Sequence, residues 1–76
     1  MTMLMYPINS SIITATGYNA ATKTAFVEFT NGALYTYSNV PPAEYDNLRL
    51  APSVGSYFTK HFKHGYTYSK IREPAK

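Results

Sequence analysis

The chain is 76 residues long and carries eight tyrosines, no tryptophan, no cysteine and a net charge of +3. This length allows one domain with a small core, and the absence of cysteine excludes disulfides, thiol catalysis and cysteine-based metal sites. No apolar run approaches the roughly 20 residues of a membrane span, and the N-terminus lacks the basic and apolar regions of a signal peptide, so we expect a cytoplasmic protein that does not enter a membrane.

Residues 1–9 are rich in methionine and other apolar residues that follow no clear period, and Pro7 interrupts any regular element. We expect an irregular tail laid over the domain. The alternative is a flexible apolar contact in an oligomer, because methionine adapts to irregular surfaces. The segment from Ser10 to Tyr18 is rich in β-branched residues and predicts the first strand.

The dipeptide Asn-Gly at 31–32 predicts a hairpin, since both residues tolerate positive φ at low cost. The segments on either side are β-like, and the loop length decides which side chains share a face. A two-residue loop would pair Phe29 with Leu34, whereas a three-residue loop, 30–32, with its glycine left-handed pairs Phe29 with Ala33. We prefer the longer loop because it gathers one apolar face, made of Ala25, Val27, Phe29, Tyr35 and Tyr37.

The preferred register leaves Glu28 and Thr36 on the outer face of the sheet. It also leaves two apolar side chains there, Phe26 and Leu34. We expect the C-terminal tail or another subunit to cover them.

Two helices are predicted after the strands. Residues 42–50 form the first, because a proline suits the first turn of a helix and Pro52 ends the segment. Ser53 is the predicted N-cap of the second helix, 54–64, and Gly65 its end. Its apolar stripe, with His61 as a packed histidine, consists of Val54, Tyr57, Phe58, His61 and Phe62.

These elements predict an α+β fold, in which a three-stranded antiparallel β-meander packs against two helices. Residues 66–71 alternate and predict a short extended C-terminal segment. One domain is expected over residues 10–72, with an N-terminal tail, 1–9, and a polar tail, 73–76. The expected structural core includes Val27, Phe29, Tyr35, Tyr37, Phe58 and Phe62.

The central residues follow a longer pattern: Tyr-Asn at 18–19, Tyr35-x-Tyr37, Val-Pro at 40–41, and Ser-x-Gly-x-Tyr-Phe at 53–58. At this spacing the chain resembles the KTSC domain over about residues 10–71. That family is named for the C-terminal extension of some lysyl-tRNA synthetases and also occurs as small stand-alone bacterial and phage proteins. RNA binding has been suggested for it from this attachment. No synthetase catalytic region is present, so the resemblance does not imply aminoacylation.

The start of the second helix is a candidate anion site. Backbone N–H groups and the dipole favour anions at a helix N-terminus, and the first turn holds no acidic residue. Ser53, Gly55 and Ser56 are small enough to admit a phosphate, with Arg72 or a lysine as counter-charge. The alternative is a simple N-cap, with a small residue that packs against the first helix.

Two further sets of residues are candidates for nucleic-acid binding. The cations Lys60, Lys63, Lys70 and Arg72 would contact phosphates in a salt-dependent, sequence-independent way, although a solvated helix face explains the lysines equally well. Tyr18, Tyr66 and Tyr68 lie near strand ends and are expected to be exposed for stacking on bases. Tyr35 and Tyr37 are instead expected to point at the helices.

No nucleophile with an adjacent base and no paired carboxylates stand out, so we expect no enzyme, and we expect no cofactor. His61 and His64 lack a third ligand, so we expect no metal. The sequence therefore favours a small binding module for RNA or a phosphorylated nucleotide. The alternative is a protein–protein or self-association module, a homo-oligomer, and a third reading is a phage-type protein that sequesters a nucleotide signal between subunits.

Overall fold

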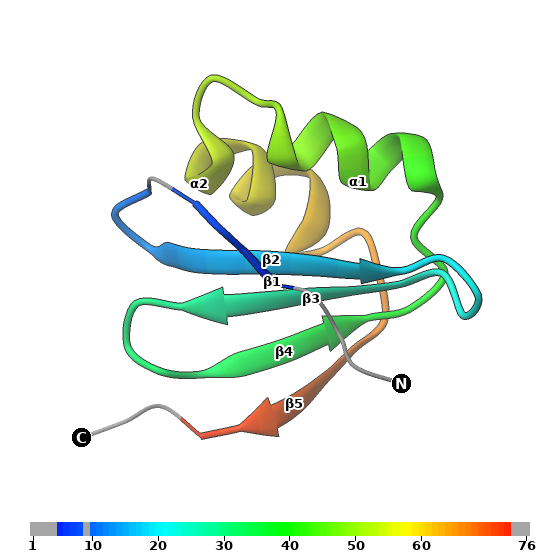
Figure 1. Cartoon of the computed structure of the whole chain (residues 1–76), viewed down its shortest axis with the longest axis horizontal. Helices are drawn as coiled ribbons and strands as arrows, with labels where there is room; N and C mark the ends of the chain where they lie inside the picture. The colour runs from blue at the N-terminus through cyan, green and yellow to red at the C-terminus, as the bar shows by residue number, and fades with distance from the viewer. Residues whose placement is uncertain (1–4, 9, 74–76) are drawn as a thin grey trace.

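The computed structural model describes residues 5–8 and 10–73, and in it five antiparallel strands form one sheet in chain order, with the helices together on one face (Figure 1). The strands are β1 (Met5–Pro7), β2 (Ile13–Asn19), β3 (Thr24–Phe29), β4 (Leu34–Tyr37) and β5 (Tyr68–Arg72). The helices are α1 (Pro42–Arg49) and α2 (Val54–Tyr57), which continues into a π-helical segment (Phe58–Phe62). The predicted α+β class is confirmed.

The sheet has two more strands than the predicted meander. Residues 5–7, predicted as part of an irregular tail, form β1, which pairs with β2 so that Met5 lies opposite Gly17. The predicted extended segment forms β5, which pairs with β4. The rest of the two predicted tails, at residues 1–4, 9 and 74–76, lies outside the described residues. Both added strands lie at the edges of the sheet.

The β3–β4 hairpin has a three-residue loop, as predicted from the apolar face that this loop length produces. Val27 lies opposite Tyr35 and Ala25 opposite Tyr37. The N–H of Phe29 donates to the carbonyl oxygen of Ala33 at 2.8 Å. Gly32 has φ 94°, a conformation that residues with a side chain rarely adopt. The prediction of the register and of the left-handed glycine is therefore confirmed.

An irregularity in β2 decides which of its side chains reach the helices. The register shifts between Ile13, opposite Phe29, and Ala15, opposite Glu28. As a result Ile13 and Thr16 both face the core, although they are three residues apart. Thr16 is fully buried, and its hydroxyl forms a hydrogen bond of 3.2 Å with that of Tyr45 in α1.

On the outer face, Phe26 and Leu34 are half-buried. Leu34 lies between Glu28 on β3 and Arg72 on β5 in the register. Arg72 forms an ion pair with Glu28, so its side chain crosses β4 at Leu34. The C-terminal strand thus covers part of this face through one long side chain, as Lys and Arg stems often do.

The second helix is shorter than predicted and changes its geometry half-way. The N–H of Lys63 donates to the carbonyl oxygen of Phe58 at 3.0 Å, an i→i+5 bond. The wider turn aligns residues four apart, so that Val54, Phe58 and Phe62 are buried. His61 is rotated out of this line and is exposed. The prediction of a packed His61 is therefore wrong.

The core lies between the sheet and both helices. Four of the expected core residues are buried: Val27, Tyr37, Phe58 and Phe62. The other two, Phe29 and Tyr35, are half-buried and pack against that core. Their exposed parts line a cleft beside the core.

Candidate functional site

An aromatic cleft of about 430 Å³ opens where the π-helical segment faces β4 and β5. Its polar rim is formed by Asn31, Lys63 and His64, and Tyr68 closes it from the edge strand. Its remaining aromatic lining consists of Phe29, Tyr35, Tyr37 and Phe58. We call this site the aromatic cleft.

Tyr68 is the accessible ring of the aromatic cleft. Its side chain is 56% exposed, and its ring lies 5.6 Å from that of Tyr35 and 6.1 Å from that of Tyr37, tilted to both. Tyr37 lies deeper, and burial raises the pKa of its hydroxyl well above the ordinary value, assisted by the neighbouring Tyr35. The cleft thus has a buried aromatic floor and one wall that a flat ligand can reach.

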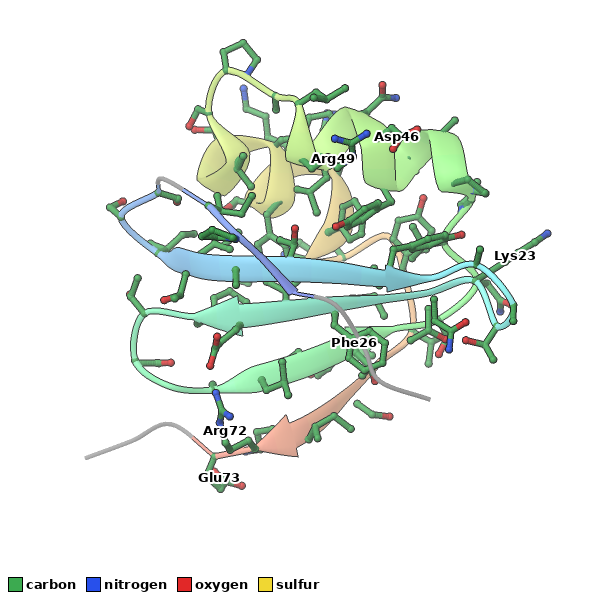
Figure 2. The ribbon with its side chains drawn as sticks, viewed as in Figure 1. Lys23, Phe26, Asp46, Arg49, Arg72 and Glu73 are labelled. Carbon is green, nitrogen blue, oxygen red and sulfur yellow. The ribbon has the colours of Figure 1, made fainter. Side chains whose placement is uncertain are left out.

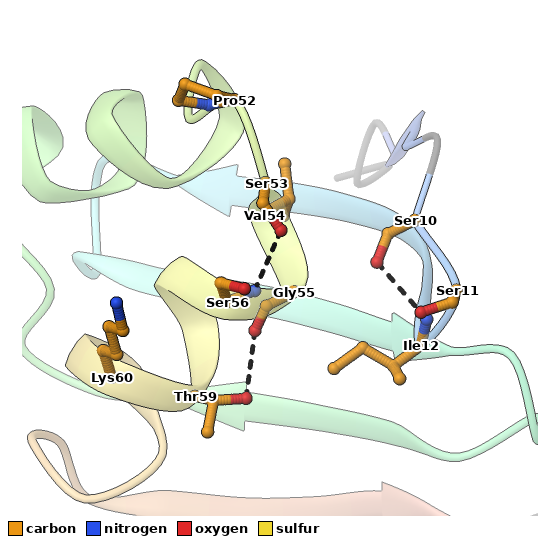
Figure 3. Close-up of a pocket in the computed structure, with 10 residues that line it drawn as sticks. All are labelled: Ser10, Ser11, Ile12, Pro52, Ser53, Val54, Gly55, Ser56, Thr59 and Lys60. Carbon is orange, nitrogen blue, oxygen red and sulfur yellow. Dashed lines mark hydrogen bonds between the residues drawn. The ribbon is translucent and has the colours of Figure 1, made fainter.

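A second cleft, of about 500 Å³, lies between the start of α2 and the loop before β2 (Figure 3). We call it the serine cleft, because Ser10, Ser11, Ser53 and Ser56 line it together with Lys60. The side-chain oxygen of Ser53 accepts a hydrogen bond from the N–H of Ser56 at 3.4 Å, so the predicted N-cap is confirmed.

Gly55 permits the close approach of α2 to the loop before β2. A Cβ at this position would lie 3.1 Å from Oγ of Ser10 and 3.2 Å from Cγ1 of Ile12. A larger residue would therefore crowd residues 10–12, so this position packs against that loop and not against α1 as expected. The phosphate site at Ser53, Gly55 and Ser56 stays a prediction.

The two clefts adjoin. Ile12 and Thr59 line both of them, and Ile12 is 39% exposed. Lys60 borders the serine cleft, and Lys63, three residues later, borders the aromatic cleft. Residues 10–12 had no role in the sequence-based site, because only the fold brings them to α2.

The surroundings of both clefts are electropositive. Among the described residues that line them there is no aspartate or glutamate. The ion pairs within the described part of the chain are Arg49–Asp46, Lys70–Glu73 and Arg72–Glu28. Lys60 and Lys63 take part in none of these three pairs, so their charges remain available to a ligand.

The predicted cation set is only partly brought together. Arg72 lies beside the β3–β4 hairpin, away from α2 (Figure 2), and its Nε donates to the carbonyl oxygen of Gly32 at 2.8 Å. It cannot serve as counter-charge at Ser53, and that part of the prediction is wrong. Lys70 is paired with Glu73 at 3.1 Å, and that hydrogen bond raises the pKa of Lys70.

Two of the three tyrosines predicted to be free for stacking are already engaged. Tyr18 stacks on Tyr45 with ring centroids 5.0 Å apart, and its hydroxyl donates to the carbonyl oxygen of Val40 at 2.5 Å. Tyr66 packs at 5.1 Å from Phe62. Both rings are half-buried. Only Tyr68 has the predicted exposure, because it lies on an edge strand.

A polar cluster joins the two helices and was not anticipated. The hydroxyl groups of Tyr57 and Tyr66 both donate to the carboxylate of Glu44 in α1, the second at 3.2 Å. The hydrogen bond to Glu44 raises the pKa of Tyr57, and burial and the same carboxylate raise the pKa of Tyr66. No spacing in the sequence indicates this cluster, since its members come from three segments.

Within residues 5–8 and 10–73 no three histidine, aspartate or glutamate side chains converge as metal ligands. In that same part of the chain, each helix is too short or too polar to cross a bilayer.

Comparison with known proteins identifies the fold. A family model for the KTSC domain matches residues 9–66. The chain belongs to the KTSC domain family. The crystal structure of a KTSC domain protein from Yersinia pestis superposes with a TM-score of 0.87 at 29% identity, covering 93% of this chain and 100% of that one.

Relatives of this KTSC domain include small proteins and long ones. A protein of Stutzerimonas stutzeri is 38% identical over 84% of this chain and 92% of its own length. A protein of Tsukamurella paurometabola is 43% identical over 70% of this chain and 79% of its own length. The lysine–tRNA ligase of Nostoc punctiforme is 34% identical over 80% of this chain, but over only 11% of the ligase. The KTSC domain thus matches a small part of that enzyme.

Proposed function

We propose that this KTSC domain is a non-enzymatic binding module for a nucleotide unit, a base with its phosphate, presented by RNA or by a free phosphorylated nucleotide. The observation that carries the proposal is the aromatic cleft, which is lined both by the accessible ring of Tyr68 and by Lys63, a cation with no acidic partner among the described residues. A base needs a ring to stack on, and a phosphate needs a nearby positive charge.

The base is assigned to the cleft because of its lining. A volume of about 430 Å³ falls in the range of small-molecule sites, about 300–1,000 Å³. Tyr35 and Tyr68 offer ring surfaces, and every base has a face that stacks on such a ring. Asn31 at the rim adds hydrogen-bonding groups. The expected ligand is a flat aromatic group, with weak preference among bases.

The phosphate is assigned to the helical rim. Lys63 is a cation without an acidic partner among the described residues, and His64 lies next to it. Lys70 lies opposite Tyr35 in the register and would supply a second charge if it left Glu73. The lysine–tRNA ligases that contain a similar region act, by their name, on a tRNA, which favours RNA as the source of the nucleotide.

Fluorescence anisotropy with a labelled short single-stranded RNA, and with free nucleotides as competitors, tests this proposal. Tyr68→Ala should weaken binding by about 1–3 kcal/mol, the cost of losing one base–aromatic stack. Lys63→Ala should weaken binding and lower the slope of log K against log salt by about 0.7. The control is Lys23→Asn, which removes a charge at the β2–β3 turn, at the other end of the sheet (Figure 2), and suits the left-handed φ of 53° there.

Phosphate contacts are favoured at a low salt concentration, such as about 50 mM. If neither RNA nor a nucleotide binds under this condition, the proposal fails. Competition separates the two sources: a free nucleotide that displaces RNA fully at low concentration would make the nucleotide the ligand. Loss of binding in Lys23→Asn equal to that in Lys63→Ala would mean that only net charge matters.

The edge strand β5 favours self-association as a second candidate. All of its residues are exposed, and Ile71 is 59% exposed. No described strand pairs with its free side, so a second copy could add its own strand there. Sedimentation at rising protein concentration would show a dimer that Ile71→Lys abolishes and salt does not weaken. A monomer at every concentration removes this candidate.

A further inference from the structure

The aromatic cleft and the serine cleft are neighbours, and we call the pair the groove, whose two halves differ in chemistry. Ile12 and Thr59 line both halves, so a ligand that occupies both must pass over these two side chains. The aromatic half offers rings. Of the residues that line the other half, none is aromatic, and half carry hydroxyl groups.

The serine cleft retains hydrogen-bond donors for an anion. Oγ of Ser10 accepts from the N–H groups of Ile12 and Ile13, and Oγ of Ser53 accepts from the N–H of Ser56. A hydroxyl group has one proton to donate besides its acceptor positions. The backbone N–H groups therefore fix the position of both serine oxygens, and each hydroxyl group can still donate its proton to a ligand.

Lys60 supplies the charge in this half of the groove. Figure 3 shows its side chain beside Ser56, on the helix that borders the cleft. Lys60 and Lys63 are three residues apart along the chain, and Lys63 lines the aromatic half of the groove. Each lysine borders a different half, so two phosphates of one strand can be contacted at once.

Resting on the proposed function, we propose that the ligand is a single strand of at least two nucleotides: the aromatic cleft binds one base, the strand crosses Thr59, and the phosphate of the next nucleotide lies in the serine cleft against Lys60. A duplex is excluded as ligand, because its bases are stacked on each other and cannot reach Tyr35 and Tyr68. Hydroxyl groups and a lysine read no base, so the second position is not sequence-specific.

The test compares a nucleoside monophosphate with a dinucleotide and a longer single strand, each bound to the wild-type protein, Lys60→Ala and Lys63→Ala. Lys60→Ala should lower the affinity for the dinucleotide and the longer strand, lower their salt slope by about 0.7, and leave the monophosphate unchanged. Lys63→Ala should weaken all three. Ser56→Asp, which places a negative charge in the first turn where the helix dipole favours it, should keep the melting temperature and weaken only the longer ligands.

If Lys60→Ala and Ser56→Asp bind the dinucleotide as tightly as the wild-type protein while Lys63→Ala does not, the ligand occupies the aromatic cleft alone. This inference then fails and the proposed function stands. If a matched duplex RNA competes as well as the single strand, this inference also fails. If the wild-type protein binds no probe at all, the proposed function fails with it.

Discussion

Single residues in this domain hold backbone conformations and close contacts that other residues do not tolerate. Gly32 has φ 94° in the β3–β4 loop. At Gly65 a Cβ would lie 2.5 Å from the carbonyl oxygen of His61, so even alanine would force the chain after the helix to move. The conformation of Gly32 could be predicted from the sequence because Asn-Gly has a known preference, whereas the contact of Gly65 with the backbone of His61 is apparent only from the structure.

Gly32→Val should lower the free energy of unfolding by more than about 1 kcal/mol, since a β-branched residue at positive φ is strained. Urea denaturation measures the loss. Ala21→Val, in the exposed β2–β3 turn, is the control and should change little. A Gly32→Val variant with an unchanged midpoint would contradict the observed loop conformation.

The tyrosine hydroxyls predict how stability depends on pH. The pKa values of Tyr37, Tyr57 and Tyr66 are raised in the folded protein, so the unfolded chain loses these protons first as the pH rises. Their contribution to stability is complete below the unfolded pKa of about 10 and is lost as the pH rises through the raised folded values.

Urea denaturation from about pH 8 to about pH 11 should therefore show stability falling above about pH 10. Tyr57→Phe removes one of the groups with a raised pKa and should give a shallower fall. Parallel curves for the variant and the wild-type protein would show that the bond from Tyr57 to Glu44 does not perturb this titration.

At the scale of elements, the two tyrosines of β4 differ in burial, although they lie on the same face of one short strand. Tyr37 is 3% exposed and contacts Phe58 and Phe62 edge-on. Tyr35, two residues earlier on the same face, is half-buried and lines the aromatic cleft. Alternation predicted that both rings face the helices, but it could not predict that Tyr35 stays half-buried and lines a cleft.

Tyr37→Ala is expected to destabilise the domain by about 3–5 kcal/mol, the cost of removing a buried aromatic ring, and a domain this small could unfold. Tyr35→Ala should cost less stability and lose RNA affinity instead. Thermal melts and anisotropy on both variants make the comparison. A Tyr37→Ala variant as stable as the wild-type protein would contradict the burial of this ring.

At the scale of the whole molecule, the sheet, the two helices and most of the core could be predicted from the sequence, because alternation, Asn-Gly and the prolines are local signals. β1, the pairing of β5 with β4 and the groove could not. β1 is recognised by its partner strand and not by its own composition, whereas alternation indicated β5 as an extended segment but not its place in the sheet. The groove combines the loop 10–12, the helix and β5, which are far apart along the chain. The same holds for Arg72, whose partner Glu28 removes it from the predicted anion site.

The central claim is that the aromatic cleft binds a nucleotide unit, and an NMR titration of isotope-labelled protein with a short single-stranded RNA tests it most directly. We predict that the amide signals of Lys63, His64 and Tyr68 shift with added RNA, and that those of the β2–β3 turn around Lys23 do not. The shifts should be lost in Tyr68→Ala. Signals that stay unmoved around the cleft at saturating RNA, or that move only with protein concentration along β5, would contradict the claim.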